Sequence, residues 1–445
     1  KNYSPGEDRP LKSVQQTTLN ATDARQVSVL RGAESTSMFP ALSGSCYELR
    51  GAIINRLLRR LAPGQGFESI MQYEYVKSQE QLRRLVDRLR GCAILGVDTE
   101  AAGYHRYHDR ISLVQISSPT ENFLIDPITI DDLSVLGALF ESPAIEKIFH
   151  DADFDLRILD RDLGLRISNL FDTQIAAAFV GERSLGLGAI VEKYLGIALP
   201  KAFQRADWAE RPLTEGMMEY AATDTVHLAE LREKLIAELE KRGRMAWAQE
   251  EFTRREGTRW TEPEDRAEAF LKMKGARDLT PRGLAILREL YTWREEVGKE
   301  RDQATFRILP NQSMLEMSLK APTSQGDLRT IQGLSSGLAD RRGRDLLAAI
   351  KRGLAVPEGE LPRFAPSRRW ERDPQAEERG EKLRQARAKV AEELDLDQGF
   401  IVSRAVLDEV ARQNPQTLEQ LAAIPELRRW QIEALGPTLL QALKS

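Results

Sequence analysis

Residues 94–104 read ILGVDTEAAGY, and this stretch decides the fold of the segment around it. The run from Cys92 to Val97 is apolar and rich in β-forming residues, which predicts a buried strand that ends in Asp98-Thr99-Glu100. Side chains alternate along a strand, so Asp98 and Glu100 are expected to share a face and to be able to bind one cation together. Two acids at a strand end are more often a solvated turn, so the triplet needs partners elsewhere in the chain.

Length and composition are those of an ordinary globular protein. The 445 residues correspond to about two to four domains, and the hydrophobic content of 41 % suffices for buried cores. The formal net charge of −4 argues against non-specific coating of nucleic acid, although it is compatible with a local basic groove. Two cysteines, Cys46 and Cys92, form neither a disulfide framework nor a cysteine-rich zinc site, which is typical of a reducing compartment.

The ends of the chain and its apolar runs indicate where the protein works. No apolar run approaches the ~20 residues that span a bilayer, and the N-terminus has no signal-peptide pattern, so we expect a cytoplasmic protein with no membrane partner. Residues 1–70 mix Ser, Thr, Gly and Pro with one helix-like patch at 47–61, which predicts a disordered extension. Met71 is followed at once by a predicted strand and helix, and our hypothesis is that the native chain begins near it.

Residues 71–244 alternate between strand and helix patterns. Three sequential strands joined by short turns, then a helix and another strand, indicate a mixed sheet flanked by helices, and therefore one α/β domain. The strand and helix directly after Met71 come first. Further strands are predicted at 93–100, 111–117, 122–126 and 146–150, and further helices at 131–140, 155–163, 172–180, 187–195 and 214–239.

The rest of the chain is predicted to be helical. Residues 245–275 read as a charged helical connector, followed by two helical units at 276–355 and 379–445 that share one layout. Between these units, residues 356–378 contain four prolines among charged residues, which indicates a semi-rigid linker.

The two helical units differ in charge. The first contains 14 Lys and Arg against 10 Asp and Glu, whereas the second contains 10 of each. The excess of basic residues in the first unit includes Arg341, Arg342 and Arg344 at a helix start. It favours contacts of this unit with the phosphate backbone of RNA. The alternative is that the unit is a structural spacer. Trp293 and Trp430 are expected to be core residues.

Further acidic residues and one tyrosine fall on separate predicted elements. Asp155 lies at the start of the helix that follows strand 146–150, and Tyr220 and Asp224 share one face of another helix. Taken alone, Asp155 reads equally as a helix N-terminal acid, and the pair as a packed aromatic and a surface acid. If the four carboxylates met, each like-charge pair ~4 Å apart would cost on the order of 4 kcal/mol at an effective dielectric near 20, so convergence would require cations.

In this order, Asp98-x-Glu100, His150-x4-Asp155 and Tyr220-x3-Asp224 resemble the three exonuclease motifs of the DEDD 3′–5′ exonuclease superfamily, tyrosine branch. The segments FDTQ at 171–174 and DWAERPLT at 207–214 match as well. The two helical units resemble HRDC domains, and the combination over about residues 71–445 is similar to the ribonuclease D family.

The resemblance implies an RNase H-like exonuclease domain followed by two small all-α HRDC-like domains. It implies that Asp98, Glu100, Asp155 and Asp224 bind two divalent cations, Mg²⁺ or Mn²⁺, which prefer oxygen ligands. Tyr220, with an ordinary pKa near 10, would orient water by hydrogen bonding. The implied activity is that of a 3′–5′ exoribonuclease that releases nucleoside 5′-monophosphates, with tRNA precursors and other small structured RNAs as substrates.

Other functions stay open at the level of sequence. A DNA 3′ exonuclease is one, because sugar discrimination depends on contacts to the 2′-OH. A non-catalytic nucleic-acid-binding scaffold is another, although the complete set of motif residues weighs against it, and a partner-dependent nuclease is a third. Outside the predicted site, His150 reads as a satisfied strand-end histidine. Lys201, Arg205 and Trp208 have the chemistry to grip a phosphate and stack a base, and Trp208 reads equally well as core.

Overall fold

The computed structural model describes residues 72–262, 266–365 and 373–444. The disorder expected for residues 1–70, the patch at 47–61 and part of the proline-rich linker lie outside these ranges. No helix among the described residues has the length and apolar character that a membrane span requires.

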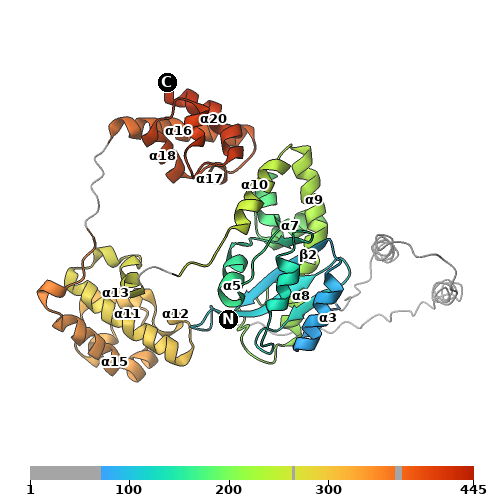
Figure 1. Cartoon of the computed structure of the whole chain (residues 1–445). Coiled ribbons are helices and arrows are strands. Elements are labelled where there is room, and N and C mark those ends of the chain that lie inside the picture. Colours follow the sequence, from blue (N-terminus) through green and yellow to red (C-terminus); the bar gives the residue numbers. More distant parts are fainter. Residues whose placement is uncertain (1–71, 263–265, 366–372, 445) are drawn as a thin grey trace, which may run out of the picture. The chain divides into compact units, whose positions relative to one another are not determined.

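A mixed six-stranded sheet organises the first part of the described chain (Figure 1), as predicted. Its spatial order is β1-β4-β3-β2-β5-β6. Strand β2 is antiparallel to β3, and β3 to β4, whereas the other neighbours are parallel. The strands are β1 (Glu74–Val76), β2 (Ile94–Ala101), β3 (Ile111–Ser117), β4 (Asn122–Ile125), β5 (Glu146–Phe149) and β6 (Leu170–Asp172). The sequence prediction lacks β6, whose last residue, Asp172, is assigned there to the start of the helix 172–180.

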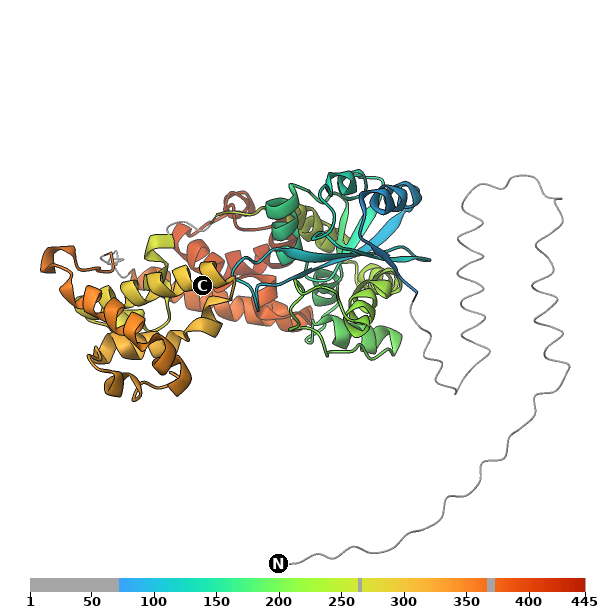
Figure 2. The same ribbon diagram turned by 90° about the horizontal axis from the view of Figure 1, so that it is seen from below.

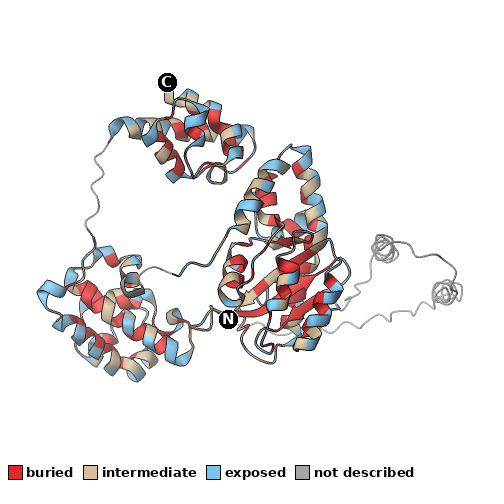
Figure 3. Cartoon of the chain, in the orientation of Figure 1, coloured by how far each residue is buried: buried red, intermediate tan, exposed pale blue. Residues whose placement is uncertain are grey.

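Helices lie on both faces of this sheet (Figure 2). One face packs with α3, α4 and α5 into an apolar core, and the other packs mainly with α6 to α9. Buried residues concentrate on the sheet and on the inward sides of the helices (Figure 3). These helices are α3 (Gln79–Leu89), α4 (Gly137–Phe140), α5 (Asp153–Leu163), α6 (Thr173–Phe179), α7 (Leu187–Leu195), α8 (Glu215–Val226) and α9 (Leu228–Lys241).

Two helix predictions are corrected by the structure. The predicted helix 214–239 is two helices, α8 and α9, which meet at His227. Neither glycine nor proline marks this break, which coincides with a tight contact of Thr225 with the sheet. The predicted helix 131–140 forms only as the 3₁₀ turn η2 (Ser134–Leu136) and α4. The predicted connector is helical in α10 (Met245–Glu256) and η3 (Arg266–Lys272).

Two helical bundles with separate apolar cores follow. Trp293 and Trp430 are 7 % and 2 % exposed, so the prediction that both are core residues is confirmed. The first bundle contains η4 (Ala276–Asp278), α11 (Pro281–Arg301), α12 (Thr305–Ile308), α13 (Asn311–Lys320), α14 (Gln325–Leu328), α15 (Ser336–Ala355) and η5 (Glu358–Glu360). The second contains α16 (Pro374–Glu393), α17 (Gln398–Ile401), α18 (Arg404–Gln413), α19 (Leu418–Ala422) and α20 (Arg429–Lys444).

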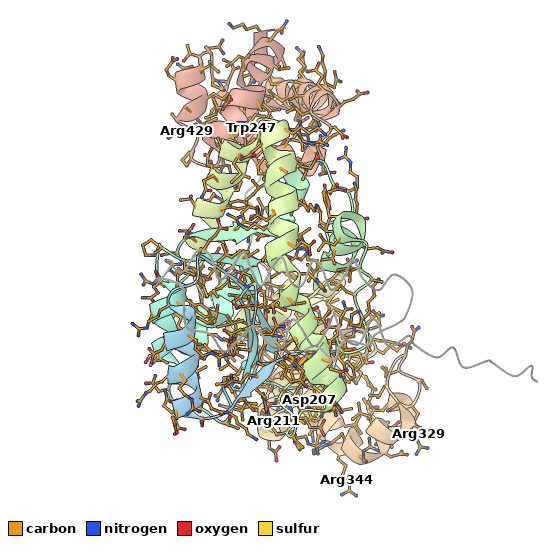
Figure 4. All side chains as sticks on the ribbon, turned by 90° about the vertical axis from the view of Figure 1, so that its right-hand side faces the viewer. Asp207, Arg211, Trp247, Arg329, Arg344 and Arg429 are labelled. Carbon is orange, nitrogen blue, oxygen red and sulfur yellow. The ribbon has the colours of Figure 1, made fainter. Side chains whose placement is uncertain are left out.

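The second bundle contacts α10 through the first turn of α20. The ring of Trp430 stacks on Trp247 with centroids 5.6 Å apart, and its indole N–H donates to Glu251 at 2.8 Å. The backbone N–H groups of Arg429 and Trp430 donate to Glu250 at 2.8 and 3.0 Å. Trp247 and Arg429 mark this contact in Figure 4. The carboxylate of Glu250 thereby satisfies donors at a helix N-terminus, where negative charge is stabilising.

Candidate active site

Strand β2 carries two of the predicted site residues on the face toward α8. Asp98 and Glu100 share this face with Gly96, as the alternation predicts, while Leu95 and Val97 belong to the core on the other side. A β-carbon on Gly96 would lie 2.8 Å from the backbone oxygen of Thr225. Because Gly96 has no side chain, the end of α8 approaches β2 closely.

This close approach brings three predicted ligands together. Carboxylate oxygens of Asp98, Glu100 and Asp224 all lie within 4.8 Å of one another, and each residue is partly buried. Three oxygen donors at this spacing suit a hard divalent cation such as Mg²⁺ or Mn²⁺.

Asp155 lies beside this group but does not belong to it. It sits in the first turn of α5, is 5 % exposed, and accepts a hydrogen bond of 2.5 Å from the hydroxyl of Thr99 on β2. The turn before α5 is held by Asp172, whose carboxylate accepts from the N–H groups of Asp151 and Ala152 at 3.1 and 2.9 Å. The same carboxylate also caps α6, so one buried acid fixes the starts of two helices.

The sequence prediction does not include Asp172 as a site residue. Its N-cap position, directly before a helix, is the signal that could have identified it.

Burial and mutual repulsion make the acidic cluster unfavourable as four free anions. Burial, with repulsion from Asp224, raises the pKa of Asp98 to about 8. Burial also raises the pKa of Asp224 to about 7, against a lowering by its hydrogen bond with Tyr220. Burial also raises the pKa values of Glu100 and Asp155 well above their ordinary range, and repulsion from the Asp98 carboxylate is the next largest cause for both. A bound cation would reverse this balance and favour the carboxylate forms.

Tyr220 lies one turn before Asp224 on α8 and is 7 % exposed. Burial and the neighbouring carboxylates raise its pKa further above the usual 10, so the phenol keeps its proton and donates to Asp224. Its ring packs near Trp208 and Phe203, each at a centroid distance of 6.1 Å. Trp208 is 1 % exposed, which supports its reading as a core residue.

An ion pair holds the segment that supports Tyr220. Arg211 donates to both carboxylate oxygens of Asp126 at 2.7 and 2.8 Å, and a third N–H reaches the backbone oxygen of Trp208 at 2.7 Å. Asp207 and Arg211 mark this segment in Figure 4. Residues 207–214 resemble a family segment by sequence, but nothing in the sequence pairs Arg211 with the distant Asp126.

A cavity of about 510 Å³ opens onto this site. Asp98, Glu100, Tyr220 and Asp224 line it, whereas Asp155 is not among the lining residues. Its other walls come from Val97, His150 and Leu228 and from residues 186–189, 199–201 and 204, which include Lys201 and Gln204. The His150 ring nitrogen Nδ1 lies 2.9 Å from the hydroxyl of Thr173, whereas its Nε2 is buried without a hydrogen-bond partner among the described residues. The prediction of a satisfied strand-end histidine therefore holds for one ring nitrogen only.

Comparisons with known proteins agree with this geometry. A 3′–5′ exonuclease family model matches residues 73–240, and an HRDC domain model matches residues 283–350 and 376–443. A ribonuclease D of Pseudomonas paraeruginosa is 30 % identical over 381 residues, which is 85 % of this chain and 100 % of that protein. The ribonuclease D of Escherichia coli is 33 % identical over 295 residues, or 66 % of this chain and 78 % of that protein.

Solved structures give the same picture. The crystal structure of Escherichia coli RNase D, an exoribonuclease involved in structured RNA processing, matches with a TM-score of 0.61 at 29 % identity, covering 84 % of this chain and 99 % of that one. The crystal structure of a protein from Bifidobacterium adolescentis matches with a TM-score of 0.67 at 26 % identity, covering 84 % and 97 %.

Proposed function

From the premise that this chain belongs to the ribonuclease D family and is a 3′–5′ exoribonuclease, we propose that it hydrolyses the last phosphodiester bond of RNA 3′ ends at the acidic cluster. The observation that carries the proposal is the approach of Asp98, Glu100 and Asp224 to within 4.8 Å at a cavity that Tyr220 also lines. Asp155 is the fourth carboxylate of the proposed site, and a hydrogen bond from the Thr99 hydroxyl holds it next to β2.

In this reaction a water oxygen forms a bond to the terminal phosphorus while the bond from phosphorus to the 3′ oxygen breaks. The products are a nucleoside 5′-monophosphate and an RNA shortened by one residue that ends in a 3′-OH. When bound by the four carboxylates, two divalent cations, Mg²⁺ or Mn²⁺, would supply acidity to the attacking water and stabilise the leaving oxygen. Tyr220 keeps its proton, so its part is to orient the water or a phosphate oxygen by hydrogen bonding.

The substrates that we propose are tRNA precursors and other small structured RNAs with unpaired 3′ tails, in the cytoplasm. The similarity to a ribonuclease that processes structured RNA supports the substrate class. The basic first bundle supports it too, because four of its arginines line one cavity: Arg301, Arg307, Arg341 and Arg342.

The division into an exonuclease domain at 71–244, a connector at 245–275, HRDC-like domains at 276–355 and 379–445, and a linker at 356–378 stays a prediction. The ranges matched by the family models, 73–240, 283–350 and 376–443, support it.

The test is a time course on a 5′-labelled RNA with an unpaired 3′ tail and on a DNA of the same sequence, with Mg²⁺, Mn²⁺ or EDTA. We expect a ladder that shortens the RNA from its 3′ end, requires the cation, and is lost in Asp98→Ala. Faster degradation of the DNA would move the substrate to deoxyribonucleic acid. Binding of either strand without degradation would contradict the proposed hydrolysis and favour a scaffold or a partner-dependent nuclease.

A further inference from the structure

Two large aromatic side chains remain exposed next to each other outside the acidic cluster. Tyr104, in the loop after β2, is 42 % exposed, and Phe306, in α12, is 47 % exposed. Their ring centroids lie 5.3 Å apart. We call these two rings the aromatic platform. Exposed aromatic pairs leave apolar surface in water, and such surface often marks a binding site.

The backbone around the platform is held in place. The guanidinium Nε of Arg307 donates to the backbone oxygen of Tyr104 at 2.9 Å, and the N–H of Ala304 donates to the backbone oxygen of His105 at 2.9 Å. The His105 ring in turn lies 2.8 Å from the backbone oxygen of Arg205. The rings are therefore presented on a fixed frame, although they are exposed.

Two cations accompany the platform. The guanidinium carbons of Arg307 and Arg205 lie 4.9 and 5.6 Å from the centroid of the Tyr104 ring, within the range of cation–π contacts. Both side chains are exposed, and within residues 72–262, 266–365 and 373–444 neither forms an ion pair with a carboxylate. The platform therefore combines aromatic faces with positive charge that is available to an anion.

The platform connects the catalytic cavity with a basic cavity. Gln204 lines the catalytic cavity, and its neighbour Arg205 contacts the platform. Tyr104 follows Glu100 by four residues, so their Cα atoms are at most ~14 Å apart. Arg307, on the other side, lines a second cavity of about 510 Å³. The charged residues of this basic cavity are Arg301, Arg307, Arg341 and Arg342, of which Arg342 pairs with Asp345 at 3.1 Å.

We propose that the aromatic platform is a stacking subsite for the unpaired RNA nucleotides directly 5′ of the bond that is cut, and that the basic cavity binds the backbone phosphates of the nucleotides that follow. Aromatic faces stack bases of any sequence, and arginines bind the phosphates between them. The direction of the strand rests on the proposed function, since the 3′ end must occupy the acidic cluster. The platform thus makes tail length, rather than tail sequence, the property that the enzyme recognises.

The first experiment measures binding without cleavage. A fluorescent single-stranded RNA of about ten nucleotides, within the span of a single-strand binding site, is titrated by fluorescence anisotropy into Asp98→Asn carrying Tyr104→Leu, Phe306→Leu or Tyr104→Phe. We expect each leucine variant to weaken binding by roughly five- to 150-fold. Tyr104→Phe keeps the ring and is expected to bind as the Asp98→Asn parent does.

The matched control loosens the same junction without removing a ring. Asp302 accepts a hydrogen bond of 3.1 Å from the N–H of His108, which belongs to the loop that carries Tyr104. Asp302→Ala is therefore expected to leave RNA affinity unchanged. A loss of affinity in Asp302→Ala equal to that in Tyr104→Leu would mean that the junction, and not stacking, carries the effect, and would overturn the proposal.

The second experiment locates the contact on the RNA. Hydrolysis of a dinucleotide and of the longer RNA is compared, the latter also with a single abasic ribose placed at successive positions 5′ of the cut bond. We expect wild type to lose activity on the abasic RNA at one or two positions, and Tyr104→Leu to be insensitive there. Because the dinucleotide offers the platform a single nucleotide, Tyr104→Leu is expected to lose less activity on it than on the longer RNA. Combining the change in the protein with the change in the RNA is a double-mutant cycle, which isolates the contact between the Tyr104 ring and one base.

The outcomes separate this inference from the proposed function. If wild type cleaves neither RNA, the proposed hydrolysis fails, and the binding titration still tests the platform. Equal affinity of the leucine variants and their parent, or an abasic penalty that Tyr104→Leu retains at every position, would overturn the stacking subsite.

Discussion

The backbone oxygen of Thr225 lies 2.8 Å from the point that a β-carbon on Gly96 would occupy. Thr225 directly follows Asp224, and Gly96 shares a strand face with Asp98. The distance between two carboxylates of the acidic cluster, Asp98 and Asp224, therefore depends on a position where any side chain other than hydrogen would collide with the backbone.

Gly96→Ala is expected to separate Asp224 from Asp98 and to lower exonuclease activity by about tenfold or more. Overpacking of this kind typically costs about 1–3 kcal/mol of stability. The measurements are the cleavage rate of tailed RNA and the unfolding midpoint in denaturant. Gly91→Ala is the control, because a β-carbon on Gly91 meets nothing within 4 Å. Wild-type activity in Gly96→Ala would show that the close approach is not needed.

Asp155→Asn is expected to reduce turnover by about 100-fold or more, equivalent to ~3 kcal/mol of lost transition-state stabilisation. Its fold should persist, since the amide can still accept the hydrogen bond from Thr99. The control is Asp153→Asn on the same helical turn, whose partners are Arg157 and Arg255 rather than the acidic cluster. Single-turnover cleavage rates of the two variants should differ; similar losses in both would remove Asp155 from the site.

Mg²⁺ is expected to stabilise the folded protein, because a cation relieves repulsion among buried carboxylates that are free to protonate in its absence. At 100 times the dissociation constant the gain would be about 2.7 kcal/mol. Thermal unfolding with Mg²⁺ and with EDTA measures it. In Asp224→Asn the gain should fall sharply. An equal gain in this variant would place the cation elsewhere.

Tyr220→Phe is expected to slow cleavage by about tenfold, equivalent to the loss of one orienting hydrogen bond of ~1.4 kcal/mol, and thus less than the loss of a carboxylate ligand. The ring packing near Trp208 and Phe203 is retained, so stability should hardly change. Cleavage rates at saturating RNA across pH test this role. A loss as large as that of Asp155→Asn would give the hydroxyl a direct part in proton transfer.

Asp126→Asn is expected to destabilise the protein by about 3–5 kcal/mol, because it leaves Arg211 without its charge partner in a site where the Asp126 side chain is fully buried. Burial alone would raise the pKa of Asp126, but the hydrogen bonds from Arg211 and Tyr75 lower it overall below 3.8. The stabilisation by this carboxylate is therefore present above about pH 3.8 and is lost as the pH falls through the lower, folded-state pKa.

Denaturant unfolding of wild type and Asp126→Asn at neutral and acidic pH provides the measurement, and the difference between them should shrink in acid. Glu80→Gln, in the exposed pair with Arg84, is the control and should cost less than about 0.5 kcal/mol. A constant difference across the acidic range would exclude the linkage to Asp126.

The sequence by itself predicted most of the elements in their order and the residues that we propose for the site. Alternation in residues 94–100 predicts β2 and the common face of Asp98 and Glu100, and helical spacing predicts that Tyr220 and Asp224 lie together. These properties are local, because each depends on residues a few positions apart. The helical character of the two bundles follows from the same kind of pattern.

Only the tertiary structure decided how these pieces meet. It breaks the predicted helix 214–239 at His227. It brings Asp224 close to Asp98, because Gly96 has no side chain to keep α8 away from β2. It also holds Asp155 next to the other three carboxylates through a hydrogen bond from Thr99. The Asp126–Arg211 pair and the platform of Tyr104 and Phe306 likewise join segments that are distant in sequence. No local pattern encodes such contacts, because they depend on the packing of whole elements and on which buried charges find a partner there.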